Sequence, residues 1–222
     1  MSDPAAPALA VRWERVCAAL AQTEAPAGDT VQSAAQLLWH ILAALYAHPP
    51  RVYHTLEHVA ACLPWLDEAR PRMGNVVGVE FALYLHDSVY VPGRADNEAR
   101  SADVAAMCLT RLGPVAVRHE RAVTQLILAT RHDGTVLAGD AALLADIDLA
   151  ILGSLPDNYD AYAAAIREEY GQVDDARYRA GRAQFLRRLL QRARIYHSAC
   201  GAECFEAAAR ANLGRELAQL AG

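Results

Sequence analysis

Val79-Glu-Phe-Ala-Leu-Tyr-Leu-His-Asp-Ser-Val89 is the stretch of sequence that decides the fold. It is apolar nearly all round except for His86 and Asp87, and the pair Pro92-Gly93 follows it. A segment that is apolar on every side is typical of a helix buried in a protein core. The sequence therefore predicts a buried helix over 79–89, with the His-Asp pair in its last turns before the Pro-Gly break.

The segments on either side of this stretch also have helical periodicity, because their apolar residues recur three or four positions apart. The expected helices cover residues 13–20, 37–45, 56–66, 97–112, 115–130, 140–152, 159–170, 176–196 and 203–220. No segment alternates apolar and polar residues with enrichment in β-branched side chains, which argues against a sheet. The sequence predicts an all-α fold.

The length of 222 residues fits one domain with a substantial core. Ser154 to Pro156 is a plausible helix start, with the proline near the first helical position. This break between helices divides a core of about 30–153 from C-terminal helices over 156–220. We expect the two parts to pack as a single helical bundle over 1–222.

Composition excludes several classes of partner. The net charge of −5 gives no electrostatic reason to expect nucleic acid or an anionic membrane, and every basic residue is arginine. The longest apolar run, 34–47, is interrupted by His40 and is shorter than the roughly 20 residues of a spanning helix. The first ten residues do not have the pattern of a secretory signal, and the five scattered cysteines are typical of a reducing compartment. These features predict a cytoplasmic enzyme.

Four side chains with nitrogen or oxygen donors occur in the order His58, His86, Asp87 and Asp148. Neighbouring residues lie about 100° apart around a helix, so His86 and Asp87 could both touch one ion placed between them. Imidazole and carboxylate donors suit Fe, Mn, Ni, Zn or Mg, and the lack of a thiolate argues against a structural zinc site. The sequence predicts one divalent metal ion held by these four residues.

Asp146 competes with Asp148 for the last ligand position, since two residues that far apart on a helix point about 200° away from each other. Asp148 shares a stripe with the bulky Leu144 and Ile151, which makes it the better candidate. His54 lies four residues before His58, so the two share a helix face. One of these histidines can bind metal while the other faces a substrate.

Several segments together resemble one known family. They are 51–58 (RVYHTLEH), 85–90 (LHDSVY), 96–98 (DNE), 101–102 (SA), 129–132 (ATRH), 146–153 (DIDLAILG), 178–182 (YRAGR), 195–196 (IY) and 209–213 (ARANL). The chain resembles the HD superfamily of metal-dependent phosphohydrolases, and specifically a small bacterial group described only as predicted HD phosphohydrolases. The resemblance covers nearly the whole chain, and it implies an HD-type helical bundle.

The activity implied by the resemblance is hydrolysis of a phosphomonoester or phosphodiester, of a nucleotide or another small molecule. Asp87 would be both a metal ligand and the group that orients the attacking water. The 51–58 segment is also similar to the Tyr-His-Asn-x-x-His run of cyclic nucleotide phosphodiesterases, with Thr55 in place of the asparagine. That pattern implies that His58 is a ligand and that His54 donates a proton to the leaving oxygen.

The resemblance implies further roles around the same site. Glu98 is expected to orient water or bind a sugar hydroxyl, and His132 to contact phosphate or a second ion. Asp133 stands where binuclear members of the superfamily often have another histidine, which favours one ion. Because guanidinium and amide groups suit phosphate oxygens, the remaining substrate-binding candidates are Arg179, Arg182, Arg210 and Asn212.

Two other functional classes stay open at this point. A di-iron oxygenase of the HD type would need metal ligands beyond His119 and His132. A non-catalytic nucleotide-binding module would tolerate the loss of donors, whereas here every expected donor is present. The expected partner is a small phosphorylated molecule, with nucleotides among the candidates, and the sequence is compatible with a homo-oligomer.

Overall fold

The structure is a computed structural model that describes residues 6–22 and 29–221. Within these residues the chain forms helices and connecting turns and no strand, which confirms the all-α prediction. The helices before the C-terminal part are α1 (Ala6–Ala21), α2 (Asp29–Tyr46), α3 (Leu56–Ala69), η1 (Arg70–Arg72), α4 (Val76–Leu85), α5 (Asn97–Leu112), α6 (Pro114–Val117), α7 (Glu120–Ala129) and α8 (Gly139–Asp148). The others are η2 (Leu149–Gly153), α9 (Pro156–Glu169), α10 (Asp175–Leu190) and α11 (Ala199–Ala221).

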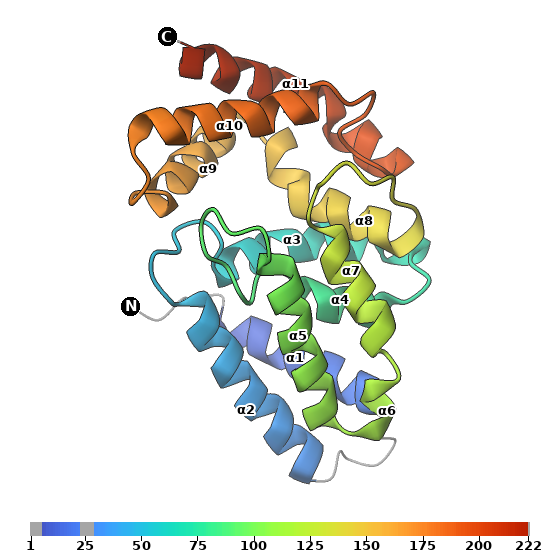
Figure 1. Ribbon diagram of the computed structural model, residues 1–222. Coiled ribbons are helices and arrows are strands. Elements are labelled where there is room, and N and C mark those ends of the chain that lie inside the picture. Colours follow the sequence, from blue (N-terminus) through green and yellow to red (C-terminus); the bar gives the residue numbers. More distant parts are fainter. Residues whose placement is uncertain (1–5, 23–28, 222) are drawn as a thin grey trace.

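Helix α4 is the centre of the larger part of the molecule, where it contacts α1, α3, α5, α7 and α8 (Figure 1). Every residue from Gly78 to Leu85 is buried, as a segment that is apolar all round requires. The charged side chain in this run, Glu80, is compensated by ion pairs with Arg12 and Arg70. The apolar core around α4 extends from α1 to the end of α8.

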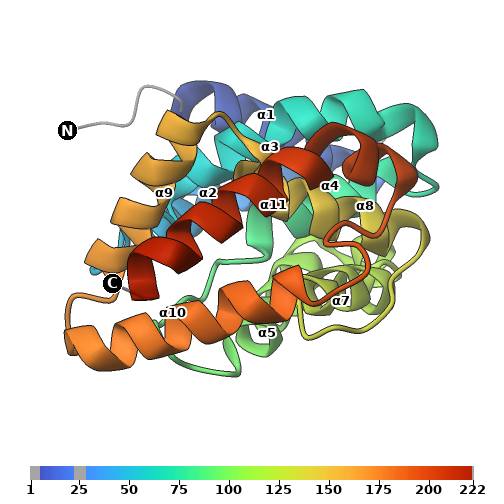
Figure 2. The same ribbon diagram turned by 90° about the horizontal axis from the view of Figure 1, so that it is seen from above.

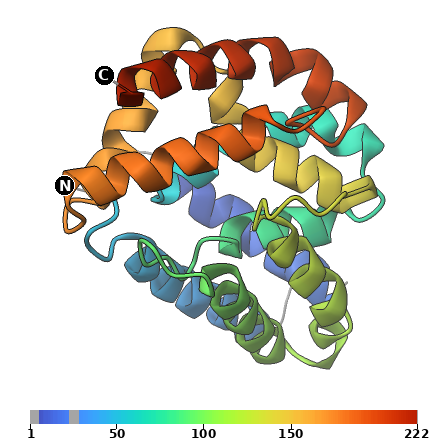
Figure 3. The same ribbon diagram turned by 45° about the horizontal axis from the view of Figure 1, so that its top comes forward.

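Helices α9, α10 and α11 form a layer over this core, as the views in Figures 2 and 3 show. They share a second apolar cluster with η2 and with Tyr53 from the larger part. Helix α11 packs closely on η2 at Gly153, where an added Cβ would lie 2.9 Å from backbone atoms of Phe205. The change from one cluster to the other occurs at Asp148 and Leu149, near the boundary suggested by the sequence.

Several helix ends differ from the sequence-based expectations. Helix α4 ends at Leu85, so His86 and Asp87 lie in the turn that follows it and not in its last turns. The helix expected over 115–130 is divided into α6 and α7, and the one over 140–152 changes to a 3-10 helix after Asp148. The helix expected over 176–196 ends at Leu190, where Arg210 donates to the carbonyl of Leu190 and to that of Arg192 in the following turn.

None of the helices in the described part of the chain combines the length and the hydropathy that crossing a membrane would require.

The start of α9 agrees with the sequence pattern, because Pro156 occupies the first helical position. Thr55, which replaces the asparagine of the phosphodiesterase pattern, caps α3 by accepting a hydrogen bond from the backbone N–H of Glu57. This cap fixes the start of the helix that carries His58.

Candidate metal centre

The four side chains predicted as donors lie together at the middle of the molecule. His58 comes from α3, His86 and Asp87 from the turn after α4, and Asp148 from the last residue of α8. The Nε2 atoms of His58 and His86 are 3.2 Å apart, and Asp148 Oδ1 lies 3.1 Å from the first and 3.4 Å from the second. Asp87 Oδ2 is 3.1 Å from His86 Nε2.

The turn after α4 determines how the His-Asp pair faces the cluster. The backbone N–H of Ser88 donates to the carbonyl of Leu85 and closes this turn directly after the helix. His86 Nδ1 lies 2.8 Å from the carbonyl of Leu83, an acceptor, so Nδ1 carries a hydrogen and Nε2 is the ring nitrogen that faces the cluster. Both side chains therefore reach the cluster although neither belongs to α4.

These distances fit the coordination shell of one divalent ion. Ligand atoms about 2.1 Å from an ion lie about 3.0 Å apart at right angles and about 3.4 Å apart at the tetrahedral angle. The separations among His58, His86 and Asp148 fall in that range, and Asp87 lies at a similar distance from His86. Within the described ranges, the ligand atoms of His58, His86 and Asp148 all lie within 4.8 Å of one another, whereas Asp87 is not part of this group and contacts it through His86. The residues present therefore fit an ion with nitrogen and oxygen ligands.

Charge in the cluster is balanced between imidazoles and carboxylates. Burial opposes the charged form of His86, but the carboxylates of Asp87 and Asp148 raise its pKa well above the usual range. Burial likewise opposes the ionised aspartates, and the charge of His86 more than offsets this and lowers the pKa of both. Both carboxylates are thus held in the anionic form that a metal ligand requires.

His132 lies beside the cluster and contacts the second oxygen of Asp148, with 2.7 Å between its Nε2 and Oδ2. Its backbone has a φ of +51°, a left-handed conformation uncommon for a residue other than glycine. Arg192 supports this conformation by donating a hydrogen bond to the carbonyl of His132. Because the imidazole donates to the carboxylate that faces His58 and His86, His132 orients that carboxylate.

A cavity of about 550 Å³ opens next to the cluster, and Asp87, Asp148 and His132 are among the residues that line it. Six aromatic residues contribute to its walls: Tyr53, Tyr90, Tyr162, Tyr170, Tyr178 and Phe185. The volume and the mixture of aromatic and charged groups are typical of a small-molecule site. The larger part of the molecule and helices α9 and α10 enclose it from opposite sides.

His54 and Glu98, the other two predicted catalytic residues, also line this cavity. The His54 ring stacks on Tyr90, with centroids 3.9 Å apart and planes 24° apart. Glu98 lies in the first turn of α5, and its partial burial raises its pKa. A carboxyl group with a raised pKa beside Asp87 can exchange a proton more readily than an exposed one.

Of the five predicted substrate-binding residues, His132 and Arg182 line the cavity, whereas Arg179, Arg210 and Asn212 do not. The Arg179 guanidinium binds carbonyl groups near the end of α11, and Arg210 binds Glu206 and carbonyl groups around the end of α10. Asn212 donates to the carbonyls of Leu152 and Ser154. These side chains hold the C-terminal layer together, and sequence alone does not distinguish such a role from phosphate binding.

Arg182 lines the cavity, but its guanidinium group is bound to other side chains. It forms a two-pronged ion pair with Glu216 at 2.8 and 3.0 Å and donates to the hydroxyl of Tyr162. Three exposed arginines that the sequence did not single out are better placed to meet an anion at the cavity wall. They are Arg131, Arg177 and Arg188.

Glu169 and Arg51 contact the catalytic candidates without being predicted to do so. Glu169 accepts hydrogen bonds from the backbone and the ring of His54. Arg51 donates to the carbonyls of His54 and Asp87, which ties the segment before α3 to the turn after α4. Arg51 belongs to the resembling segment, but no signal in the sequence pointed to Glu169, which is 115 residues from His54.

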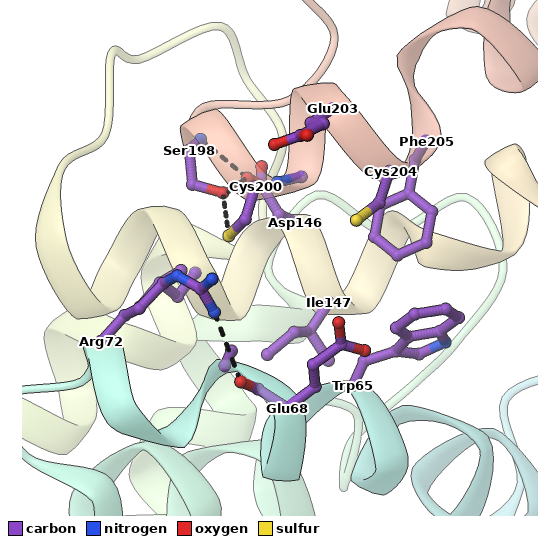
Figure 4. A pocket seen from close by; sticks show the side chains of 13 residues that line it. Trp65, Glu68, Arg72, Asp146, Ile147, Ser198, Cys200, Glu203, Cys204 and Phe205 are labelled. Carbon is purple, nitrogen blue, oxygen red and sulfur yellow. Dashed lines mark hydrogen bonds between the residues drawn. The ribbon is translucent and has the colours of Figure 1, made fainter.

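Asp146, the rejected ligand candidate, faces the opposite side of α8 and lines a second cavity of about 240 Å³ (Figure 4). Its carboxylate accepts hydrogen bonds from the backbone N–H groups of His197 and Ser198 and from the hydroxyl of Ser198. The Ser198 hydroxyl in turn accepts from Gly201 N–H and caps α11. Asp146 therefore anchors α11 to α8.

Comparisons of the chain with models of protein families, with curated proteins and with solved structures found no match.

Proposed function

We propose that this chain is a metal-dependent phosphohydrolase of the HD type, which cleaves a phosphomonoester or phosphodiester of a small molecule. The observation that carries the proposal is the cluster of His58, His86, Asp87 and Asp148, of which the two aspartates line a cavity. A divalent ion held by these residues would supply Lewis acidity toward a phosphoryl oxygen and toward water.

The residues around the cluster have complementary parts in this proposal. Asp87 accepts a hydrogen bond from the attacking water and orients it. His54, on the cavity wall, delivers a proton to the leaving oxygen. Arg131, Arg177 and Arg188 attract the anionic substrate at the cavity wall, where their guanidinium groups suit phosphate oxygens.

The aromatic walls favour a substrate with a flat ring, and a nucleotide has both a ring and a phosphate. Tyr53 and Tyr162 meet edge to face with centroids 4.6 Å apart, and Tyr170 and Tyr178 lie further along the same cavity. Stacking on a tyrosine is tolerant of base identity, because every base has a π-face. The proposed substrate class is therefore a small phosphorylated molecule, with nucleotides as the first to test.

The test is metal analysis of protein purified without a chelator, followed by a panel of phosphomonoesters, phosphodiesters and nucleotides. We expect about one ion per chain and release of phosphate or nucleoside by the wild type. Asp87→Ala should lose both, while the matched control Asp103→Ala, at an exposed position of α5, should keep both. Two irons per chain with oxygen uptake would indicate an oxygenase, and ligand binding by the Asp87→Ala variant without turnover by wild type would indicate a binding module.

A further inference from the structure

Glu169 is an almost completely buried carboxylate, with 1% of its surface exposed, at the last residue of α9. Its Oε1 accepts hydrogen bonds from three consecutive backbone N–H groups, those of Val52, Tyr53 and His54, at 2.8, 2.9 and 2.8 Å. Burial opposes the charge of Glu169, but the hydrogen bonds from His54 and from the backbone lower its pKa below the usual range. The carboxylate is therefore anionic inside the protein.

The second oxygen of this carboxylate binds the imidazole of His54, with 2.7 Å between Glu169 Oε2 and His54 Nδ1. An ionised carboxylate can only accept a hydrogen bond, so Nδ1 must carry the hydrogen. The stack on Tyr90 fixes the plane of the ring at the same time. His54 is thus held in one orientation and one tautomer, and Nε2 is the ring nitrogen left to exchange a proton.

We propose that Glu169 is the positioning residue of the general acid, and this inference rests on the proposed hydrolase function. The buried carboxylate accepts the hydrogen bond from Nδ1–H of His54 and so directs the transferable proton to Nε2. An acidic partner on the far nitrogen of a catalytic histidine acts in the same way in serine proteases. Glu169 does not touch the substrate and acts only through His54.

The proton balance of the step is complete. Hydrolysis breaks the bond between phosphorus and the leaving oxygen and forms one between phosphorus and the oxygen of water. The leaving oxygen takes the proton from Nε2 of His54. The attacking water loses one proton to solvent, and Asp87 accepts a hydrogen bond from this water during the attack. His54 is then reprotonated from solvent at Nε2, while the Nδ1 hydrogen stays on the ring and is donated to Glu169 throughout.

The kinetic experiment compares Glu169→Gln with Glu168→Gln, because the neighbouring glutamate is exposed. Glutamine keeps an oxygen for the three backbone N–H groups but removes the charge. We expect kcat for an alkyl phosphoester to fall on the order of 10²-fold, with KM and metal content unchanged. A nitrophenyl ester should lose only a few-fold, because its leaving group needs no proton. Equal losses on both esters would overturn the proposal.

A spectroscopic measurement tests the same contact without activity. The ¹⁵N spectra of histidine-labelled protein loaded with Zn²⁺ or Mg²⁺ report which nitrogen of neutral His54 carries the hydrogen. In the wild type it should be Nδ1, and in Glu169→Gln the glutamine NH₂ should donate to Nδ1 and move the hydrogen to Nε2. A wild-type signal from the Nε2–H tautomer would overturn the proposal even if the variant does not fold.

The two experiments separate this inference from the proposed function. If the wild type cleaves no phosphoester but the tautomer changes in Glu169→Gln alone, the hydrolase proposal fails and the positioning of His54 by Glu169 is supported. If the wild type cleaves alkyl esters and Glu169→Gln cleaves them equally well, the hydrolase proposal stands and the positioning role fails.

Discussion

His54 is the residue on which the proposed chemistry can be tested most directly, because it lines the cavity without belonging to the group of ligand atoms. Its ring is bounded by Tyr90 on one face and by Glu169 at Nδ1. A side chain fixed in this way is suited to proton transfer and does not need to hold an ion. Its removal should therefore separate catalysis from metal binding.

His54→Ala is expected to lower turnover of an alkyl phosphoester by about 10²–10⁴-fold, because the leaving oxygen loses its proton donor. Metal content should stay at the wild-type level, and a nitrophenyl ester should be affected less. Steady-state kinetics on both esters, with metal analysis of the same samples, measures this. The control is His40→Ala at an exposed position of α2. Loss of metal in His54→Ala would show that His54 is a ligand.

The charge of Glu169 should also be visible in the pH dependence of stability. Its pKa is lowered in the folded protein, so it contributes stability that is present above the unfolded pKa of about 4.3 and lost as pH falls through the folded value. Urea unfolding between pH 3 and pH 7 should show a shallower acid decline for Glu169→Gln than for the wild type. Identical curves for the two, or the same change in Glu168→Gln, would contradict this.

At the scale of elements, α8 serves two purposes with two aspartates on opposite sides. Asp148 faces the donor cluster, while Asp146 holds the start of α11 through three hydrogen bonds. The close packing leaves no room for adjustment, since a Cβ added at Gly201 would lie 2.4 Å from Asp146 Oδ2. The helix therefore joins the metal centre to the C-terminal layer.

Alanine substitution of each aspartate should give opposite results. Asp146→Ala leaves two partly buried backbone N–H groups without their acceptor and should lower the free energy of unfolding by roughly 2–4 kcal/mol, with metal content unchanged. Asp148→Ala should remove metal and keep α11 attached. Urea denaturation and metal analysis of both variants provide the measurement. Metal loss in Asp146→Ala at a temperature where it remains folded would contradict the assignment.

The elements predicted from sequence were those whose signal is local. The apolar run over 79–85 predicted a buried helix, and the stripe shared with Leu144 and Ile151 selected Asp148 over Asp146. Helix ends were less predictable: α4 ends at Leu85 through a backbone hydrogen bond from Ser88 that has no signature in side-chain type.

Long-range partnerships were not predictable in the same way. Glu169 follows Arg167-Glu168 in a polar stretch that looks like a solvated helix face, and only the tertiary fold brings it to His54. The sequence does not distinguish structural arginines from substrate-binding ones either, because Arg182, which is ion-paired, and Arg188, which is exposed, are the same residue type. Their roles depend on whether a carboxylate such as Glu216 lies within reach.

At the scale of the whole molecule, the donor cluster lies where two apolar clusters meet. All four proposed ligands come from residues 58–148, and the second cluster begins at Leu149 directly after the last of them. An ion bound there would connect α3, the turn after α4 and the end of α8. Because such an ion binds only the folded arrangement, it should add to the stability of the chain.

Removal of the ion is therefore expected to lower thermal stability. At a free ion concentration about 100-fold above Kd, binding contributes about 2.7 kcal/mol, which corresponds to roughly 5–10 °C for a chain of this size. Calorimetry with and without a chelator measures the difference. Asp87→Ala should start from the lower midpoint and show no response to the chelator. A chelator effect of equal size in that variant would mean that the ion binds elsewhere.

The position of the cavity has a consequence for how such a protein could change over evolution. The proposed ligands all precede residue 149, whereas Tyr162, Tyr178, Phe185 and the exposed arginines of α10 all follow it. Mutations in α9 and α10 could therefore give the cavity a different shape and charge without disturbing a single ligand. Glu169 is the exception, because it contacts His54 from α9. A change of substrate would then require substitutions only in the part of the chain after residue 149. Within that part, Glu169 is the position whose side chain has to be kept.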